Sequence, residues 1–168
     1  EDISVDYGKV TQHYQTRWSD PTLPAGVLRG RPPHLLSNLN ETEAEAPSDV
    51  EAGTLSPRAE IADQYNEKAV LYVLDLGVDG MTMAVSTKHA FKPGDCVAVE
   101  RANNYLNLRG INRGFCNPDN HAMIMRLRSN SVAAANQCKR AREQLVLEAA
   151  VDNLALKREA IGMLCDGS

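Results

Sequence analysis

The 168-residue sequence is poor in aromatic residues and has no long apolar run. Phe, Trp and Tyr make up 5% of the residues, against 43% for all hydrophobic types, so a folded core must depend on Val, Leu, Ile and Met. No apolar stretch approaches the roughly 18 residues that a membrane-spanning helix needs. The composition is typical of a globular protein and predicts no transmembrane segment.

Sequence motifs that carry chemistry are also missing. There is no Gly-rich phosphate loop, no Gly-x-Ser-x-Gly elbow and no Cys-x-x-Cys pair. The four histidines are dispersed without metal-ligand spacing, at His13, His34, His89 and His121. His89 is near Asp95 and Cys96, but a strand cysteine beside a surface histidine is usually structural. We therefore expect no catalytic, cofactor-binding or metal-binding residues, and we expect that the protein is not an enzyme.

Residues 69–116 combine strand-like alternation with turn signals. The apolar segments lie at residues 70–75, 81–87, 96–100 and 105–109. Asp-Gly at 79–80 is typical of a hairpin, and Pro-Gly at 93–94 fits the centre of a type II turn. Asn-Asn at 103–104 can adopt left-handed conformations. Short strands joined by tight turns favour a small curled antiparallel sheet or a barrel of the SH3 or OB kind.

One part of this pattern has a family resemblance. An apolar strand, the Asp79-Gly80 hairpin and a second apolar strand are followed by Phe-x-Pro-Gly-Asp-x-Val-x-Val over residues 91–99. This order resembles the C-terminal β-domain of SlyB-like outer-membrane lipoproteins, over residues 69–110. The family carries a glycine-zipper segment before that domain, and this sequence has none. The resemblance implies a bacterial cell-envelope protein, periplasmic or outer-membrane-associated, and implies no mechanism.

The C-terminal region changes to a helical period from Ser131 onwards. The apolar positions form two stripes that are out of phase, Ala134, Cys138, Ala141 and Leu145, then Leu147, Val151, Leu154, Ile161 and Cys165. The phase change near residues 148–152 indicates a helical hairpin, and one long helix is the alternative because no Gly or Pro interrupts the pattern. Residues 121–128 alternate in a way that favours a fifth strand over a short helix.

The N-terminal region has the composition of an extended arm. Six of the eight prolines lie between residues 21 and 57. We expect its aromatic residues to anchor the arm on another chain, at Tyr7, Tyr14 and Trp18. The sequence Arg-Gly-Arg-Pro at 29–32 matches the core of a DNA-binding AT-hook but lacks the flanking bases of that motif. Ser56-Pro57 could start a short helix.

These patterns together predict an α+β chain of three parts. The first is an extended arm over residues 1–56, and the second is a small β-domain over residues 57–128. The third is a C-terminal helical segment over residues 129–168, which we expect to form the hairpin.

Four cysteines allow three pairings if they form two disulfides, and they are Cys96, Cys116, Cys138 and Cys165. In a helical hairpin, residues 138 and 165 are symmetric about position 151.5, close to the phase change, so they would face each other. Cys96 and Cys116 would then pair across a β-hairpin and its following loop. Four buried free thiols are the alternative.

The basic residues are concentrated in residues 101–142, although the net charge of the chain is −4. Eight basic side chains occur there against one acidic side chain, and five of them are candidate partner-binding residues, Arg101, Arg109, Arg113, Arg126 and Arg128. Such a patch can face an acidic partner or nucleic acid, or can simply be solvated. The leading hypothesis is a structural subunit of a bacterial cell-envelope assembly, with other subunits or further copies of the chain as partners. The alternative is a small-barrel nucleic-acid-binding module that also uses Tyr105.

Overall fold

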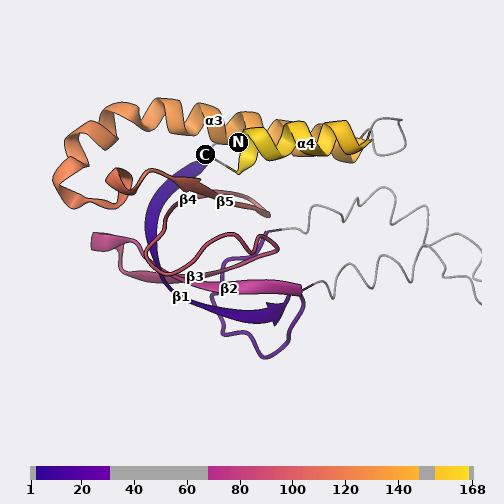
Figure 1. Cartoon of the computed structure of the whole chain (residues 1–168), viewed down its shortest axis with the longest axis horizontal. Helices are drawn as coiled ribbons and strands as arrows, with labels where there is room; N and C mark the ends of the chain where they lie inside the picture. Colours follow the sequence, from indigo (N-terminus) through magenta and orange to yellow (C-terminus); the bar gives the residue numbers. More distant parts are fainter. Residues whose placement is uncertain (1–2, 31–67, 148–153, 167–168) are drawn as a thin grey trace, which may run out of the picture.

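The computed structural model describes residues 3–30, 68–147 and 154–166. These residues form a five-stranded antiparallel sheet followed by two helices (Figure 1). The strands are β1 (Ser4–Arg17), β2 (Lys68–Asp75), β3 (Met81–Ser86), β4 (Cys96–Ala102) and β5 (Tyr105–Ile111). The helices are α3 (His121–Leu147) and α4 (Leu154–Cys165), with short 3-10 turns η1 (Gly77–Asp79), η2 (Arg113–Cys116) and η3 (Pro118–Asn120).

The sheet has the strand order β3-β2-β1-β4-β5 and is strongly curled. The inner face of the curl is filled by a single apolar cluster, with Val10, Tyr72, Leu74, Val97 and Leu108 among its buried members. The α+β class with a curled antiparallel sheet is therefore confirmed. The sheet does not close into a barrel, so the SH3 or OB alternative is not the architecture that forms.

Strand β1 is the central strand of the sheet, where we had expected an extended arm. It pairs with β4 through Ser4–Lys9 and with β2 through Lys9–Arg17. The arm prediction for residues 1–56 is thus wrong for its first part, and the β-domain does not begin at residue 57. Residues 11–17 are polar because that half of β1 is largely exposed, although it is paired. Their sequence therefore lacks the apolar alternation that would have indicated a strand. The rest of the predicted arm, and the helix predicted at Ser56-Pro57, fall on residues 31–67, outside the described residues.

Trp18 is part of the intramolecular core and is not an anchor on another chain. Its side chain is 6% exposed and packs with Ala69 and Val85, from β2 and β3. Partly buried Leu23 and Val27 complete this cluster. The segment that follows β1 therefore folds back beneath the sheet, which its proline-containing sequence did not reveal.

The same segment then reaches the outer edge of β3. Leu28 forms a parallel bridge with Ala84. The Leu28 N–H donates to the Met83 carbonyl at 2.8 Å, and the Val85 N–H donates to the Leu28 carbonyl at 3.0 Å. An edge strand presents unpaired backbone groups, so this bridge covers part of the β3 edge.

Gly30 brings the segment against the opposite edge of the sheet, strand β5. It is buried, and a Cβ at this position would lie 2.6 Å from the backbone nitrogen of Leu106. Residues 28–30 therefore bridge the two edge strands of the curl. The AT-hook interpretation of residues 29–32 does not fit, because Gly30 is packed on β5 and cannot enter a DNA minor groove; residues 31 and 32 are outside the described residues.

The predicted turn residues adopt the expected backbone conformations. Gly80 follows η1 in the β2–β3 connection with φ 83°, and Gly94 has φ 98°. The Asp95 N–H donates to the Lys92 carbonyl at 3.0 Å, as expected for the turn through Pro93-Gly94. Asn104, between β4 and β5, has φ 59°. These turns depend on local sequence alone, which explains why they could be predicted.

Helix α3 begins at His121, so the strand predicted over residues 121–128 is wrong. Asn117 caps the preceding turn, and Pro118 occupies its first position. Ile124 is buried, whereas Met123 and Met125 are about half exposed. The alternation of these methionines therefore does not reflect a buried strand face. The segment is helical, and Ile124 is the residue that it buries. None of the described helices is long and apolar enough to cross a membrane.

Helices α3 and α4 pack side by side along one side of the sheet (Figure 1). Below α3, a second apolar cluster contains Ile3, which directly precedes β1, and Val5 of β1 together with Ala98 of β4 and Ala135 of α3. Strand β4 is therefore covered on both faces, by the interior of the curl and by α3. This arrangement buries the polar side chains that β4 and β5 direct toward the helices.

We predict that Gly30→Ala lowers the free energy of unfolding by about 1–3 kcal/mol, because backbone atoms must shift to admit the new methyl group. Gly162→Ala in α4 is the matched control, because the nearest atom there is a flexible carboxylate oxygen of Asp166 at 3.3 Å. Urea unfolding followed by circular dichroism measures both variants. Equal stability of the two would contradict the packing of residues 28–30 on β5.

Candidate functional site

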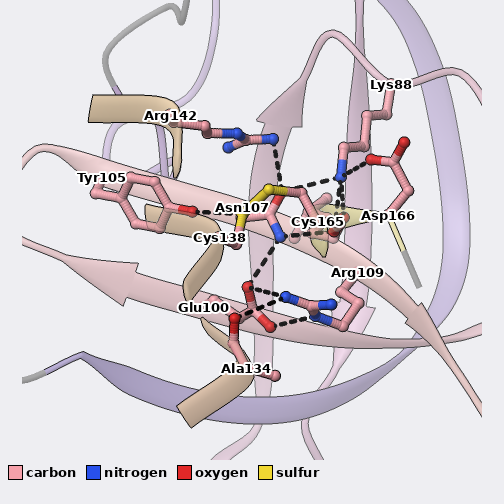
Figure 2. The surroundings of a disulfide bond; sticks show 11 residues. Lys88, Glu100, Tyr105, Asn107, Arg109, Ala134, Cys138, Arg142, Cys165 and Asp166 are labelled. Carbon is pink, nitrogen blue, oxygen red and sulfur yellow. Dashed lines mark hydrogen bonds and ion pairs between the residues drawn. A yellow bond between two sulfur atoms is a disulfide. The ribbon is translucent and has the colours of Figure 1, made fainter. Parts of the chain in front are cut away.

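A buried polar network connects the sheet to both helices beneath one disulfide (Figure 2). Its central residues are Glu100 of β4 and Asn107 of β5, which lie opposite each other in the antiparallel ladder. Val97 and Val99 face the interior of the curl, so strand alternation directs Glu100 toward the helices. Glu100 is 1% exposed and Asn107 is 2% exposed. Buried polar groups of this kind require hydrogen-bond partners.

The Asn107 amide makes all four hydrogen bonds of which it is capable. Its Nδ2 donates to Glu100 Oε1 and to the Cys165 carbonyl, both at 2.9 Å. Its Oδ1 accepts from Lys88 Nζ and from Arg142 Nη2, again both at 2.9 Å. The side chain thus joins β4, the segment after β3, helix α3 and the end of helix α4.

Arg109 provides the counter-charge for Glu100. Its Nε donates to Glu100 Oε2 at 2.6 Å, and the two side chains are 13% and 1% exposed. Its Nη2 makes longer bonds, at 3.4 Å to Glu100 Oε1 and at 3.3 Å to the Ala134 carbonyl of α3. Burying one member of such a pair without the other is strongly unfavourable, so the two residues form one unit.

Lys88 holds the end of α4 onto β5. Its Nζ donates to the Leu108 carbonyl at 2.8 Å and to the Cys165 carbonyl at 3.2 Å, and it pairs with Asp166 at 2.7 Å. The Gly110 N–H also donates to the Asp166 carbonyl at 3.0 Å. Burial lowers the pKa of the Lys88 ammonium, and the hydrogen bond that it donates to Asp166 acts in the opposite direction. A cation at this point also complements the carbonyl end of the α4 dipole.

Tyr105 covers the network on the side of the disulfide. Its hydroxyl lies 3.0 Å from Cys138 Sγ. The Lys139 ammonium and the Arg142 guanidinium lie 5.9 Å and 5.8 Å from its ring centroid. Burial raises the pKa of the Tyr105 phenol to about 12, because the phenolate would be poorly solvated there.

Both predicted disulfide pairings are present. Cys138 and Cys165 are bonded, with their Cα atoms 5.1 Å apart, and this bond joins α3 to the end of α4. Cys96 and Cys116 are bonded, with their Cα atoms 5.9 Å apart, and join β4 to η2. The alternative of four free thiols is therefore wrong, as is one continuous helix. Bonded Cys96 cannot serve as the nucleophile that a set with His89 would need.

Most of the predicted partner-binding residues have partners within the chain. The Tyr7 hydroxyl donates to Ser131 Oγ at 2.7 Å, and the Tyr7 ring contacts Phe115 with centroids 5.2 Å apart. Tyr14 is 52% exposed, so it alone of the three predicted aromatic anchors keeps an accessible ring.

The predicted arginine patch is not assembled into one surface. Arg109 belongs to the buried network, and Arg101 pairs with Asp6 at 3.1 Å. Arg113, Arg126 and Arg128 are exposed, the first in η2 and the others in α3. A continuous basic stripe for phosphate binding would need all five arginines on one face, and Arg101 and Arg109 are already paired with acids.

The network pairs Glu100 with Arg109 and Asp166 with Lys88, and the Asn107 amide holds Arg142, which suits a stabilising role. Within residues 3–30, 68–147 and 154–166, no group of three or more His, Cys, Asp or Glu residues could hold a metal ion. Sequence reasoning missed the contributions of Lys88, Glu100, Asn107 and Asp166. Glu100 gave no usable signal, because an acid on the strand face opposite Val97 and Val99 is typical of a solvated face.

No family model, curated protein or solved structure matches this chain. The resemblance of residues 69–110 to the SlyB-like β-domain therefore stays a prediction.

We predict that Asn107→Ala lowers the free energy of unfolding by about 2–4 kcal/mol, because it leaves several buried donors and acceptors without partners. Asn130→Ala, at an exposed position of α3, is the matched control and should change stability by less than about 0.5 kcal/mol. Chemical denaturation measures both. A small effect at residue 107 would mean that water replaces the amide readily.

The raised pKa of Tyr105 predicts a pH dependence of stability. The folded pKa of about 12 lies above the ordinary tyrosine pKa of 10.0, so this residue's contribution to stability is fully present below pH 10 and is lost as pH rises toward 12. Burial also raises the pKa of Tyr72, so absorbance titration at 295 nm should show a late phenol step whose amplitude falls in Tyr105→Phe and is kept in Tyr14→Phe. Loss of the late step in Tyr14→Phe instead would contradict the assignment.

Proposed function

We propose that this chain is a structural subunit of a bacterial cell-envelope assembly, periplasmic or outer-membrane-associated. The observation that carries the proposal is the arrangement beneath the Cys138–Cys165 bond. There, buried charges and hydrogen bonds join the sheet to the helices beside a covalent link. A cross-linked fold of this kind is stable, and a structural component of an assembly requires stability.

The proposed compartment is supported by the cysteines. All four cysteines are in disulfides, and structural disulfides persist in oxidising compartments such as the bacterial periplasm. The resemblance of residues 69–110 to SlyB-like lipoproteins supports the same location.

The proposed contact surface is the second half of β1. Strand β4 pairs with β1 only as far as Lys9, whereas β2 continues along it to Arg17. Among the described residues, positions 12–16 therefore have a neighbouring strand on one side only. Open edges of this kind accept a further strand from a partner. Tyr14, with its exposed ring, lies in the middle of this edge and keeps its predicted role as a partner contact.

The nucleic-acid alternative has no comparable support. Of its six proposed residues, Arg109, Tyr105 and Arg101 are engaged in internal contacts. A charge-driven interaction would fall steeply with added salt, so a gel shift at two salt concentrations distinguishes this alternative from the assembly.

The proposal predicts that the protein, extracted from envelope fractions of its native cells, runs as a complex larger than its own 18.4 kDa and contains no free thiols. Gln15→Lys should weaken the complex, because a lysine on an open edge opposes strand addition. Met163→Lys, at an 80% exposed position of α4, should not. Light scattering and thiol labelling measure both properties. A cytoplasmic, reduced monomer would overturn the proposal.

A further inference from the structure

A cavity of about 260 Å³ lies between helix α3 and the outward face of strands β4 and β5. It takes its floor from Ala98, Glu100 and Arg109, and it takes part of its roof from Ser131 and Ala134 of α3. An apolar cavity of roughly 150 Å³ is enough to hold a benzene molecule. This cavity therefore has room for a substituted aromatic ring.

The walls of the cavity are apolar and partly aromatic. The rings of Tyr7 and Phe115 lie 5.2 Å apart between centroids, with their planes tilted by 41°. Ile111 from β5 and Leu127 from α3 also line the space. Aromatic side chains in such tilted arrangements offer both faces and edges to another ring. The walls thus favour a flat aromatic molecule over a flexible polar one.

The floor offers one hydrogen-bond donor and one acceptor side by side. Arg109 Nε is fully used by Glu100, but Arg109 Nη2 makes only the long bonds at 3.4 Å and 3.3 Å. No described residue accepts a hydrogen bond from the remaining terminal nitrogen of Arg109. Guanidinium groups carry five N–H donors, and a carboxylate has about four acceptor positions, so both groups of the pair can take a further partner.

We propose that this cavity is a binding site for a small neutral phenol-type molecule, an aromatic ring that carries one hydroxyl group. The ring of the ligand packs against Tyr7 and Phe115 on one side and against α3 on the other. The hydroxyl of the ligand faces the Glu100–Arg109 pair. Its O–H donates to the Glu100 carboxylate, and its oxygen accepts from the Arg109 guanidinium. This site goes beyond the assembly role and does not depend on it.

The charge of the floor argues for a neutral ligand. Glu100 and Arg109 compensate each other, so a carboxylate on the ligand would meet the Glu100 carboxylate at close range without a free counter-charge. A pure hydrocarbon would cover the unused Arg109 donors and leave them unpaired, which is unfavourable because they would lose their contact with water. A hydroxyl satisfies both groups at once.

Isothermal titration calorimetry of the full chain with 4-ethylphenol tests the proposal directly. Ethylbenzene and 4-ethylbenzoate are the matched probes, which lack the hydroxyl or carry a negative charge. We expect saturable binding of the phenol, and binding at least about tenfold weaker for each of the other two. No saturable binding of the phenol, or equal binding of ethylbenzene or 4-ethylbenzoate, would overturn the proposal.

The location is tested by two leucine substitutions on the same helix. Ala134→Leu places a larger side chain in the cavity and should weaken binding of 4-ethylphenol by at least about tenfold. Ala133→Leu, at the adjacent exposed position, should leave the affinity unchanged within about twofold. If Ala134→Leu fails to fold, nuclear Overhauser contacts between 4-ethylphenol and Phe115 of the unaltered chain decide the location. Contacts elsewhere on the protein would refute it.

Discussion

The hydrogen bonds of the Asn107 amide are the constraint on which the rest of this structure depends. They connect β4, helix α3, the segment after β3 and the end of helix α4 at one buried point. Each partner is itself a strong donor or acceptor that would be costly to bury alone. The network is therefore satisfied only when sheet and helices are correctly placed together, which favours one arrangement over near alternatives.

The curled sheet likewise depends on contacts between segments that are distant in the sequence. Because β1 is central, every other strand depends on it for pairing, directly or through a neighbour. The chain then returns through Trp18 and Leu28 to the β3 edge and through Gly30 to the β5 edge. The two disulfides add covalent links from β4 to η2 and from α3 to α4. These links stabilise a small domain whose core contains few aromatic residues.

The electrostatics follow from this packing. The basic residues after residue 100 suggested a surface for an acidic partner, but Arg109 and Arg142 point inward to Glu100 and Asn107. Both arginines can be buried because a layer shielded from solvent lies between the curled sheet and helix α3. The adjoining cavity belongs to the same layer, which is why it combines apolar walls with a charged floor. Stability and a capacity for ligand binding thus arise from one structural feature.

The sequence by itself determined the turns at Gly80, Gly94 and Asn104 and four of the five strands, and it favoured the two disulfide pairings without fixing them. These depend on neighbouring residues or on the symmetry of a helical hairpin. Only the tertiary structure decided that residues 4–17 form the central strand and that Trp18 is a core residue. It also decided that Glu100 meets Asn107 and Arg109. Such outcomes depend on which distant segments supply hydrogen bonds and cover, and no local pattern encodes that choice.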